Sequence, residues 1–298
     1  MPSMKISKLP LLICLAVFHF LLHGGTPAGA AERREPHVFF LIGESEYDTK
    51  TTLPAFAKAE LEPRGIRCSF SILPNDSANE FPGLDALKDA GLLFISVRRH
   101  APPKAQMDAI RAHVAAGRPV AGIRTASHAF ALRGKNAAVP DGHADWPEFD
   151  RDVLGGNYRD HYGQGIATFG KIYPDAAGNP VLTGIAAGEF RVPSHLYRNP
   201  DLPAFITVLM TARMEGRPEV EPIAWLNTSG GRRVFYTSLG SPEDFAVPQF
   251  RRLLLNGIHW ALGVPVPAAT LGIRHDLRRD AHGARSTVGQ SIVRRRLP

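Results

Sequence analysis

The 298-residue sequence predicts an α/β fold with a flavodoxin-like, doubly wound and mostly parallel sheet. Short apolar runs alternate along the chain with segments whose apolar residues recur at helical spacing. The first apolar run is continuous and ends in glycine, as expected of a parallel strand that is buried on both faces. This alternation predicts a sheet with helices on both faces, and ligands bind such sheets outside the carboxyl ends of the strands.

Strands and helices alternate through the first half of the body. The run HVFFLIG (37–43) is the first expected strand. The segment 102–118 begins with proline and ends with glycine, the asymmetry typical of a helix. The remaining strands are expected at 66–73, 91–97 and 119–124, and the remaining helices at 52–65 and 81–90.

The middle of the chain, roughly 133–222, has a different composition. It is rich in Gly, Pro, His and aromatic residues and short of periodic segments. Such a stretch predicts loops and short antiparallel strands around a site. Regular structure is expected again in a strand at 232–240 and in an amphipathic helix at 248–263, capped by Gly263.

The first thirty residues resemble a secretory signal peptide. Lys5 and Lys8 precede an apolar run at 9–22, and Ala28-Gly29-Ala30 fits a cleavage signal. We therefore expect export, periplasmic or secreted, with no membrane association after cleavage. The alternative is an uncleaved membrane anchor, but the run is shorter than the roughly 20 residues that a spanning helix needs.

The charge distribution argues against a nucleic-acid partner. Of the formal net charge of +7, the leader carries +2 and residues 268–298 carry +5, which leaves none for residues 31–267. We expect the body, 31–267, to form one domain and the basic tail, 268–298, to be disordered. After cleavage one cysteine remains, Cys68, so no intramolecular disulfide can form, and we expect it to be a small buried residue.

Several ordered motifs resemble the ThuA-like, or trehalose-utilisation, family, which has the class I glutamine amidotransferase-like fold. The resemblance extends from about Val38 to Val264. Its motifs are PVAGIRTASHAF (119–130), LGGNYRDHYG (154–163), PVLTGI (180–185), SHLY (194–197), and 222–245 continuing into the last helix. It implies a role in the catabolism of disaccharides, in particular of keto-sugars.

Two positions depart from this family. Arg124 and Ser241 stand where members often carry histidine, so this protein either uses other groups for chemistry or has lost catalytic activity at this turn. The glutaminase relatives place a cysteine at the turn after the fourth strand. Here that turn, RTASH (124–128), has none, so glutamine hydrolysis through a thiolate is excluded.

Arg124 is the strongest functional candidate at this turn. Its guanidinium could hold two ligand oxygens at once, and Glu44 or Glu46 at the end of the first strand are its expected partners. Ser127 and His128 look like a nucleophile and its base. However, neighbouring side chains diverge on a helical turn, so we expect Ser127 to be a helix cap. His128 lines the site or satisfies a buried carbonyl.

Further candidates lie in the middle of the chain and after the last strand. His128, His161 and His195 could together form a three-imidazole metal site, but their spacing is not diagnostic. Binding of a divalent metal therefore remains an open alternative, and no residue is assigned as a metal ligand. Other cofactors are unknown. Asp244 could cap the last helix or act as a general base. The aromatic candidates for sugar stacking, each equally explained by core packing, are Trp146, Tyr158, Tyr162 and Tyr197.

The sequence thus predicts an exported protein that acts on or binds a small glycoside or keto-sugar. The expected catalytic residues are Arg124, His128 and His161. The expected substrate-binding residues are Glu44, Glu46, Tyr158, His195, Tyr197 and Asp244. Two alternatives stay open: a non-catalytic sugar-binding or structural module, and a metal-dependent hydrolase. The oligomeric state is not predicted.

Overall fold

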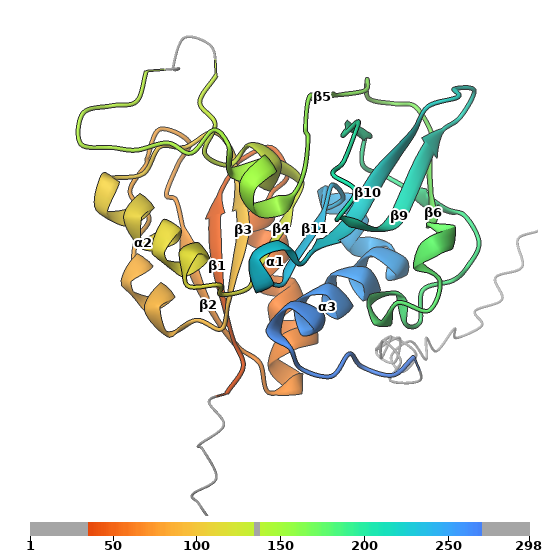
Figure 1. The fold of residues 1–298 in the computed structure, drawn as a ribbon, viewed down its shortest axis with the longest axis horizontal. Helices are drawn as coiled ribbons and strands as arrows, with labels where there is room; N and C mark the ends of the chain where they lie inside the picture. Colours follow the sequence, from red (N-terminus) through yellow and green to blue (C-terminus); the bar gives the residue numbers. More distant parts are fainter. Residues whose placement is uncertain (1–34, 134–137, 270–298) are drawn as a thin grey trace, which may run out of the picture. The chain divides into compact units, whose positions relative to one another are not determined.

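The computed structural model describes residues 35–133 and 138–269. Nine strands form one mixed sheet in the order β2-β1-β3-β4-β11-β10-β9-β6-β7 (Figure 1). The parallel strands are β1 (His37–Gly43), β2 (Arg67–Ile72), β3 (Leu92–Val97), β4 (Val120–Ile123) and β11 (Val234–Thr237). The predicted α/β fold with a mostly parallel core is confirmed. The predicted leader and residues 270–298 of the predicted tail lie outside the described residues.

The strands at the centre of the parallel part follow from their apolar composition. Every residue of β1 and β3 is buried, because each strand has neighbours on both sides and helices over both faces. β2 lies at the edge of the sheet and is mostly half-buried. Cys68 on β2 is therefore half-buried, not buried as predicted. Burial raises the pKa of its thiol to about 12, so the group stays protonated and unreactive near neutral pH.

The second half of the sheet is antiparallel. Its strands are β10 (Val220–Asn227), β9 (Thr207–Met214), β6 (Thr168–Ile172) and β7 (Phe190–Val192). The first three are labelled on the right in Figure 1. A separate two-stranded sheet joins β5 (Asp160–His161) to β8 (Tyr197–Arg198). The sequence predicted short antiparallel strands here, but β9 and β10 are each eight residues long.

Three α-helices cover the sheet: α1 (Thr49–Phe56), α2 (Lys104–Ala115) and α3 (Pro248–Leu262). α1 continues through the helical turns η1 (Ala57–Leu61) and η2 (Glu62–Arg64), so the helix predicted at 52–65 is present but irregular. The helix predicted at 81–90 is the 3₁₀ segment η3 (Leu84–Asp89). Gly263 ends α3 in a left-handed conformation, as predicted.

The helices enclose two apolar cores, one on each face of the sheet. Leu53 of α1 and Leu254 of α3 belong to the core that contains Phe40 of β1. Met107 of α2 belongs to the core that contains Phe39, the preceding residue of the same strand. Because successive side chains of a strand point to opposite faces, the predicted covering of both faces is confirmed.

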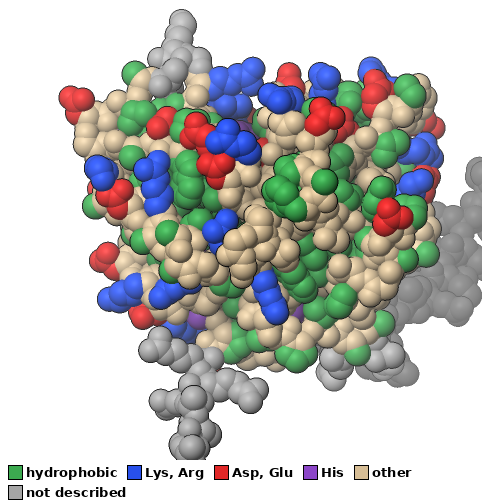
Figure 2. All heavy atoms as spheres, in the orientation of Figure 1, with side chains coloured by type: hydrophobic (Ala, Val, Ile, Leu, Met, Phe, Trp, Pro, Cys, Tyr) green, Lys and Arg blue, Asp and Glu red, His purple; other side chains and the backbone are tan. Residues whose placement is uncertain are grey.

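Charged side chains of both signs are interspersed on the face of the molecule that Figure 2 presents. Among the described residues, no helix combines the length and the apolar character needed to span a membrane.

Candidate functional site

The carboxyl ends of four parallel strands carry polar loops that meet, as the predicted topology requires. They are the residues after β1 (44–48), after β3 (98–101), the 3₁₀ turn η4 after β4 (Arg124–His128), and the segment after β11 that leads into η10 (Pro242–Ala246). Backbone bonds join neighbouring loops: the Arg99 amide donates to the His128 carbonyl oxygen at 3.0 Å. Residues from the middle of the chain complete the edge.

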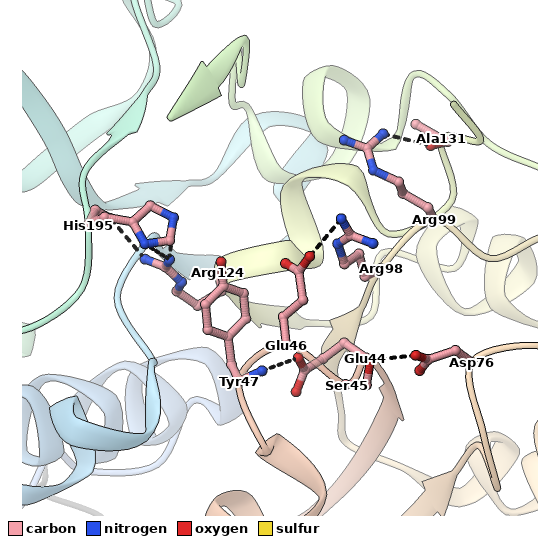
Figure 3. A network of polar contacts seen from close by, with 10 residues as sticks. All are labelled: Glu44, Ser45, Glu46, Tyr47, Asp76, Arg98, Arg99, Arg124, Ala131 and His195. Carbon is pink, nitrogen blue, oxygen red and sulfur yellow. Dashed lines mark hydrogen bonds and ion pairs between the residues drawn. The ribbon is translucent and has the colours of Figure 1, made fainter. Parts of the chain in front are cut away.

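Arg124 is fully buried at the corner where β4 turns into η4. One terminal nitrogen, Nη1, donates to the carbonyl oxygens of Ser238 at 2.8 Å and of His195 at 3.1 Å. Its guanidinium carbon lies 4.3 Å from the ring centre of Tyr47 and 4.4 Å from that of Tyr197. Figure 3 shows the guanidinium against the His195 ring. The cation is therefore held by carbonyl dipoles and two aromatic faces.

The predicted pairing of Arg124 with Glu44 or Glu46 is wrong. The Glu44 carboxylate accepts from the backbone amides of Tyr47 at 2.7 Å and Thr49 at 2.9 Å, so it stabilises the entry into α1. Glu46 forms an ion pair with Arg98 at 2.7 Å on the surface (Figure 3). Glu44 has nearer donors in its own loop and Glu46 has one in the loop after β3, which the sequence alone did not reveal.

Strained backbone gathers at this edge. Three residues other than glycine adopt a left-handed φ in the loops after β1, β3 and β4: Asp48 (48°), Arg99 (57°) and Arg124 (43°). Such conformations cost on the order of 1 kcal/mol or more and cluster at functional sites. The sharp corner after β4 is thus occupied by Arg124, and Ser127 lies three residues further on, inside η4.

Ser127 and His128 do contact each other, against the prediction that their side chains diverge. Ser127 Oγ lies 3.1 Å from His128 Nδ1 and 3.3 Å from the carbonyl oxygen of Arg124. Ser127 makes no helix-capping bond, so its predicted capping role is also wrong. The contact therefore comes from the side-chain rotamers of the two residues, which their spacing along the turn does not determine.

His128 is buried and lies in a positive field. Its ring stacks on Tyr158 at 4.6 Å between ring centres. Desolvation, reinforced by nearby arginines, of which Arg99 has the largest effect, holds the pKa of His128 well below its usual value. The imidazole is therefore neutral near neutral pH and can accept a hydrogen bond.

His161 and His195 form a second pair, with ring centres 4.6 Å apart. Desolvation, followed by the charge of Arg124, lowers the pKa of His195 to about 4. His128 packs instead against Tyr158 and Tyr197. Within the part of the chain that the structure describes, no group of three or more His, Cys, Asp or Glu residues is arranged to hold a metal ion.

Asp244 is buried in η10, and its carboxylate is fully used by protein donors. It accepts from the backbone amides of Gly240 at 2.6 Å and Ser241 at 3.0 Å. The Ser194 hydroxyl also donates to it. Asp244 thus fastens the loop before His195 to the end of β11, as a cap of η10 and not of α3. All of these donors bind Oδ2, and Oδ1 accepts from the Ser194 backbone amide at 3.3 Å, so both oxygens have protein donors, against the predicted contact with a substrate.

The other aromatic candidates divide between site and scaffold. Tyr158 and Tyr197 lie in the site, with ring centres 4.7 Å apart. Tyr162 donates from its hydroxyl to Glu221 at 2.8 Å and packs against one apolar core. Trp146 packs edge-on against Phe149. Tyr162 and Trp146 therefore have structural roles here.

Two cavities open beside these groups. One, of about 480 Å³, is lined by residues that include Glu44, Arg98 and Arg99. The other, of about 530 Å³, is lined by Arg99, Ser127, His128, Asp150, Gly156 and Tyr158, among others. Arg124 lines neither of the two. The sequence places RRH (98–100) at this edge but does not single out Arg99 as a site residue, and it gives no indication of Asp150 beyond the Gly155-Gly156 pair in LGGNY, which signals a close approach to the backbone.

A mixed sheet with a polar carboxyl edge and a strained corner after β4 defines an α/β protein with a candidate ligand site at the carboxyl edge of its sheet. The sequence model of the ThuA family, described as trehalose utilisation, matches residues 46–261. The chain belongs to the ThuA family.

Solved structures show the same fold. A protein described as ThuA-like from Bacteroides uniformis ATCC 8492 is similar with a TM-score of 0.55 and 19% identity, over 80% of this chain and 95% of that one. Another from Parabacteroides merdae ATCC 43184 has a TM-score of 0.55 and 16% identity, over 80% and 96%. The search of curated proteins found no match.

Proposed function

We propose that this ThuA-family chain is an exported protein that binds or converts a small glycoside or keto-sugar. The observation that carries the proposal is the 530 Å³ cavity at the carboxyl edge of the sheet, inside the region that the family matches. Arg99 supplies guanidinium donors there, and the neutral His128 imidazole supplies an acceptor. Together they suit an oxygen-rich ligand of the size of a sugar ring.

The roles of the predicted residues are revised accordingly. His128 and Tyr158 are proposed to contact the ligand, because both line the cavity. Arg124, Glu44 and Asp244 are proposed as positioning residues, because protein groups bind Nη1 of Arg124 and both carboxylates. His161 and His195 pack beside Tyr197 but are not among the residues that line the 530 Å³ cavity, so they would act only on a ligand that extends beyond it.

The test is turnover and binding by the purified protein with a panel of disaccharides and their keto derivatives. Conversion of one of them, abolished by His128→Ala and retained by the surface variant Lys104→Ala, would support an enzyme. Absence of both binding and conversion across the panel would refute the proposal.

A second candidate is a sugar-binding module without catalysis. It is favoured by one observation: the two departures from the family pattern, Arg124 and Ser241, are both tied into protein contacts. Calorimetric binding without product formation would identify this alternative.

Export is proposed from the leader sequence alone. Mass spectrometry of the native protein should find a mature chain that begins close to Ala31. A native chain that begins at Met1 would refute export by cleavage.

A further inference from the structure

Asp150 is a buried carboxylic acid with an unused oxygen. It is the first residue of η6 (Asp150–Leu154), a short π-helical turn, and its side chain is 9% exposed. Oδ2 accepts from the Tyr158 backbone amide at 2.8 Å. Oδ1 is buried and has no hydrogen-bond partner among the described residues. A buried carboxyl oxygen without a donor is costly, and such groups gather at functional sites.

Gly156 makes room for this oxygen. A Cβ at position 156 would lie 2.1 Å from Asp150 Oδ1, far inside contact distance. Gly156 is not among the glycines with a left-handed φ, so its backbone does not itself require glycine. The absence of a side chain at Gly156 is therefore explained by the carboxyl group of Asp150. Both residues line the 530 Å³ cavity.

The surroundings of Asp150 favour its neutral form. None of the ion pairs among the described residues includes it. Burial raises its pKa to about 7, and the amide of Tyr158 offsets only part of that effect. The charged and titratable groups that surround it are Glu148, Arg151 and Asp152 on its own segment, Arg99 after β3, His128 on η4, Arg133, Tyr158 and Arg159 on loops, and Tyr236 on β11.

Donors outnumber acceptors among the charged side chains of the cavity. Arg99, Arg133, Arg151 and Arg159 can only donate and a protonated Asp150 adds a further donor, against the acceptors Glu148 and neutral His128. An oxygen that can only accept hydrogen bonds suits such a lining better than a hydroxyl, which must also place its own proton. Two sugar groups have this chemistry: the carbonyl of a keto-sugar and the carboxylate of a sugar acid.

We propose that Asp150 binds the ligand of this cavity as a neutral acid, donating a hydrogen bond from its carboxyl group to an acceptor-only oxygen of the sugar. This inference rests on the proposed function and specifies its substrate class. No bond to carbon forms or breaks in this step, and the acid proton stays on Asp150.

The experiment measures binding by calorimetry at pH 5.5 and pH 8.5 with three probes: methyl glucoside, its 3-keto derivative and methyl glucuronoside. The variant is Asp150→Asn, since an amide can still accept from Tyr158 and can donate at every pH. The control is Asp152→Asn, which changes an exposed carboxylate of the same segment. Circular dichroism confirms that each protein is folded.

For the wild type and the control, we expect the keto or acid probe to bind at least about tenfold more tightly than methyl glucoside at pH 5.5. That preference should fall about tenfold at pH 8.5, when Asp150 ionises. Asp150→Asn should keep the preference at both pH values. If the 3-keto probe shows this preference, the recognised group is a carbonyl; if methyl glucuronoside shows it, the recognised group is a carboxylate.

Other outcomes overturn the inference in distinguishable ways. If all three probes bind equally, or if Asp150→Asn retains the wild-type pH dependence, the role of Asp150 fails while the proposed function stands. If no probe binds to the wild type, the proposed function fails together with the inference. Should Asp150→Asn not fold, a carbon-13 NMR titration of the wild-type aspartates replaces it, and a carboxyl that titrates near 4 at position 150 refutes the neutral acid.

Discussion

Arg124 shows how a residue that looks like a ligand-binding group can be consumed by the scaffold. Its guanidinium bridges the Ser238 and His195 carbonyl oxygens, which belong to segments distant in sequence. One terminal nitrogen reaches both carbonyl groups while the planar guanidinium packs on two tyrosine rings, a combination that a lysine ammonium cannot reproduce.

We therefore expect Arg124→Lys to lower the free energy of unfolding by about 2 kcal/mol, because at least one buried carbonyl loses its charged donor. Urea denaturation measures this. Arg98→Lys is the matched control, since it alters only an exposed ion pair and should cost less than about 1 kcal/mol. Equal losses for the two variants would contradict a structural role for Arg124.

Asp150 is expected to make the stability of the protein depend on pH. With its pKa raised to about 7, the folded state keeps a proton that the unfolded chain releases near pH 4. Stability is thus lost as the pH rises from 4 to 7. As the pH rises over this range, the free energy of unfolding of Asp150→Asn should increase relative to that of the wild type, by up to about 4 kcal/mol. Thermal unfolding of both proteins at pH 4.5 and 8 tests it, and a constant difference would disprove it.

Sequence reasoning located the polar corner but not the partners of its side chains. The positions of Glu44, Arg124 and Asp244 at strand ends followed from the alternation of strands and helices. Their contacts depended on loop conformations, such as the left-handed φ of Arg124, that no periodicity encodes. Asp150 was missed because its burial arises from packing with the separate segment that contains Tyr158.

At the scale of elements, α3 owes its close packing on the sheet to one glycine. A Cβ on Gly257 would lie 2.5 Å from carbons of the Phe235 ring on β11. Glycine normally lowers helix stability by about 1 kcal/mol relative to alanine. At position 257 the close approach of the Phe235 ring makes glycine more favourable than alanine.

Gly257→Ala should accordingly destabilise the protein by about 1–3 kcal/mol, in spite of the better helix propensity of alanine. Chemical denaturation measures the change. The double variant with Phe235→Leu should recover part of the loss, because the smaller side chain leaves room for the methyl group. A stabilising Gly257→Ala would show that helix and sheet separate easily.

The elements that the sequence predicted best are those with one dominant signal. β1 and α3 lie within a residue of their predicted bounds, since one is a continuous apolar run and the other has a clear apolar stripe and cap. β9 and β10 were not predicted as long strands. Pro222 within β10 and a register shift beside it obscure the pattern.

For the whole molecule, buried histidines predict sensitivity to acid. Burial lowers the pKa values of His113 and His195 to about 4, and that of His128 well below its usual value. The unfolded chain binds these protons near pH 6.5 while the folded protein does not, so stability is present above that pH and is lost as the pH falls toward 4.

For each pH unit of acidification, the free energy of unfolding falls by at most about 1.4 kcal/mol for each fully buried histidine, and by less for the half-buried His195. Unfolding by urea at pH 7 and pH 4.5 measures the loss. His113→Gln, which removes one of these groups, should lose less than the wild type over the same interval. An identical loss in both proteins would show that other groups govern the acid response.

The chain leaves the parallel part of the sheet after β4 and returns to pair beside it only as β11. The residues between Ile123 and Val234 contribute Asp150, Tyr158 and His195 to the site. Closing so long a loop loses entropy before any contact compensates for it, and folding through such distant pairings is slow. A nascent chain that has formed only its first four parallel strands has no complete cavity. The ability to bind ligand would then be acquired last during folding, and the rate at which binding appears would report the rate of the final folding step.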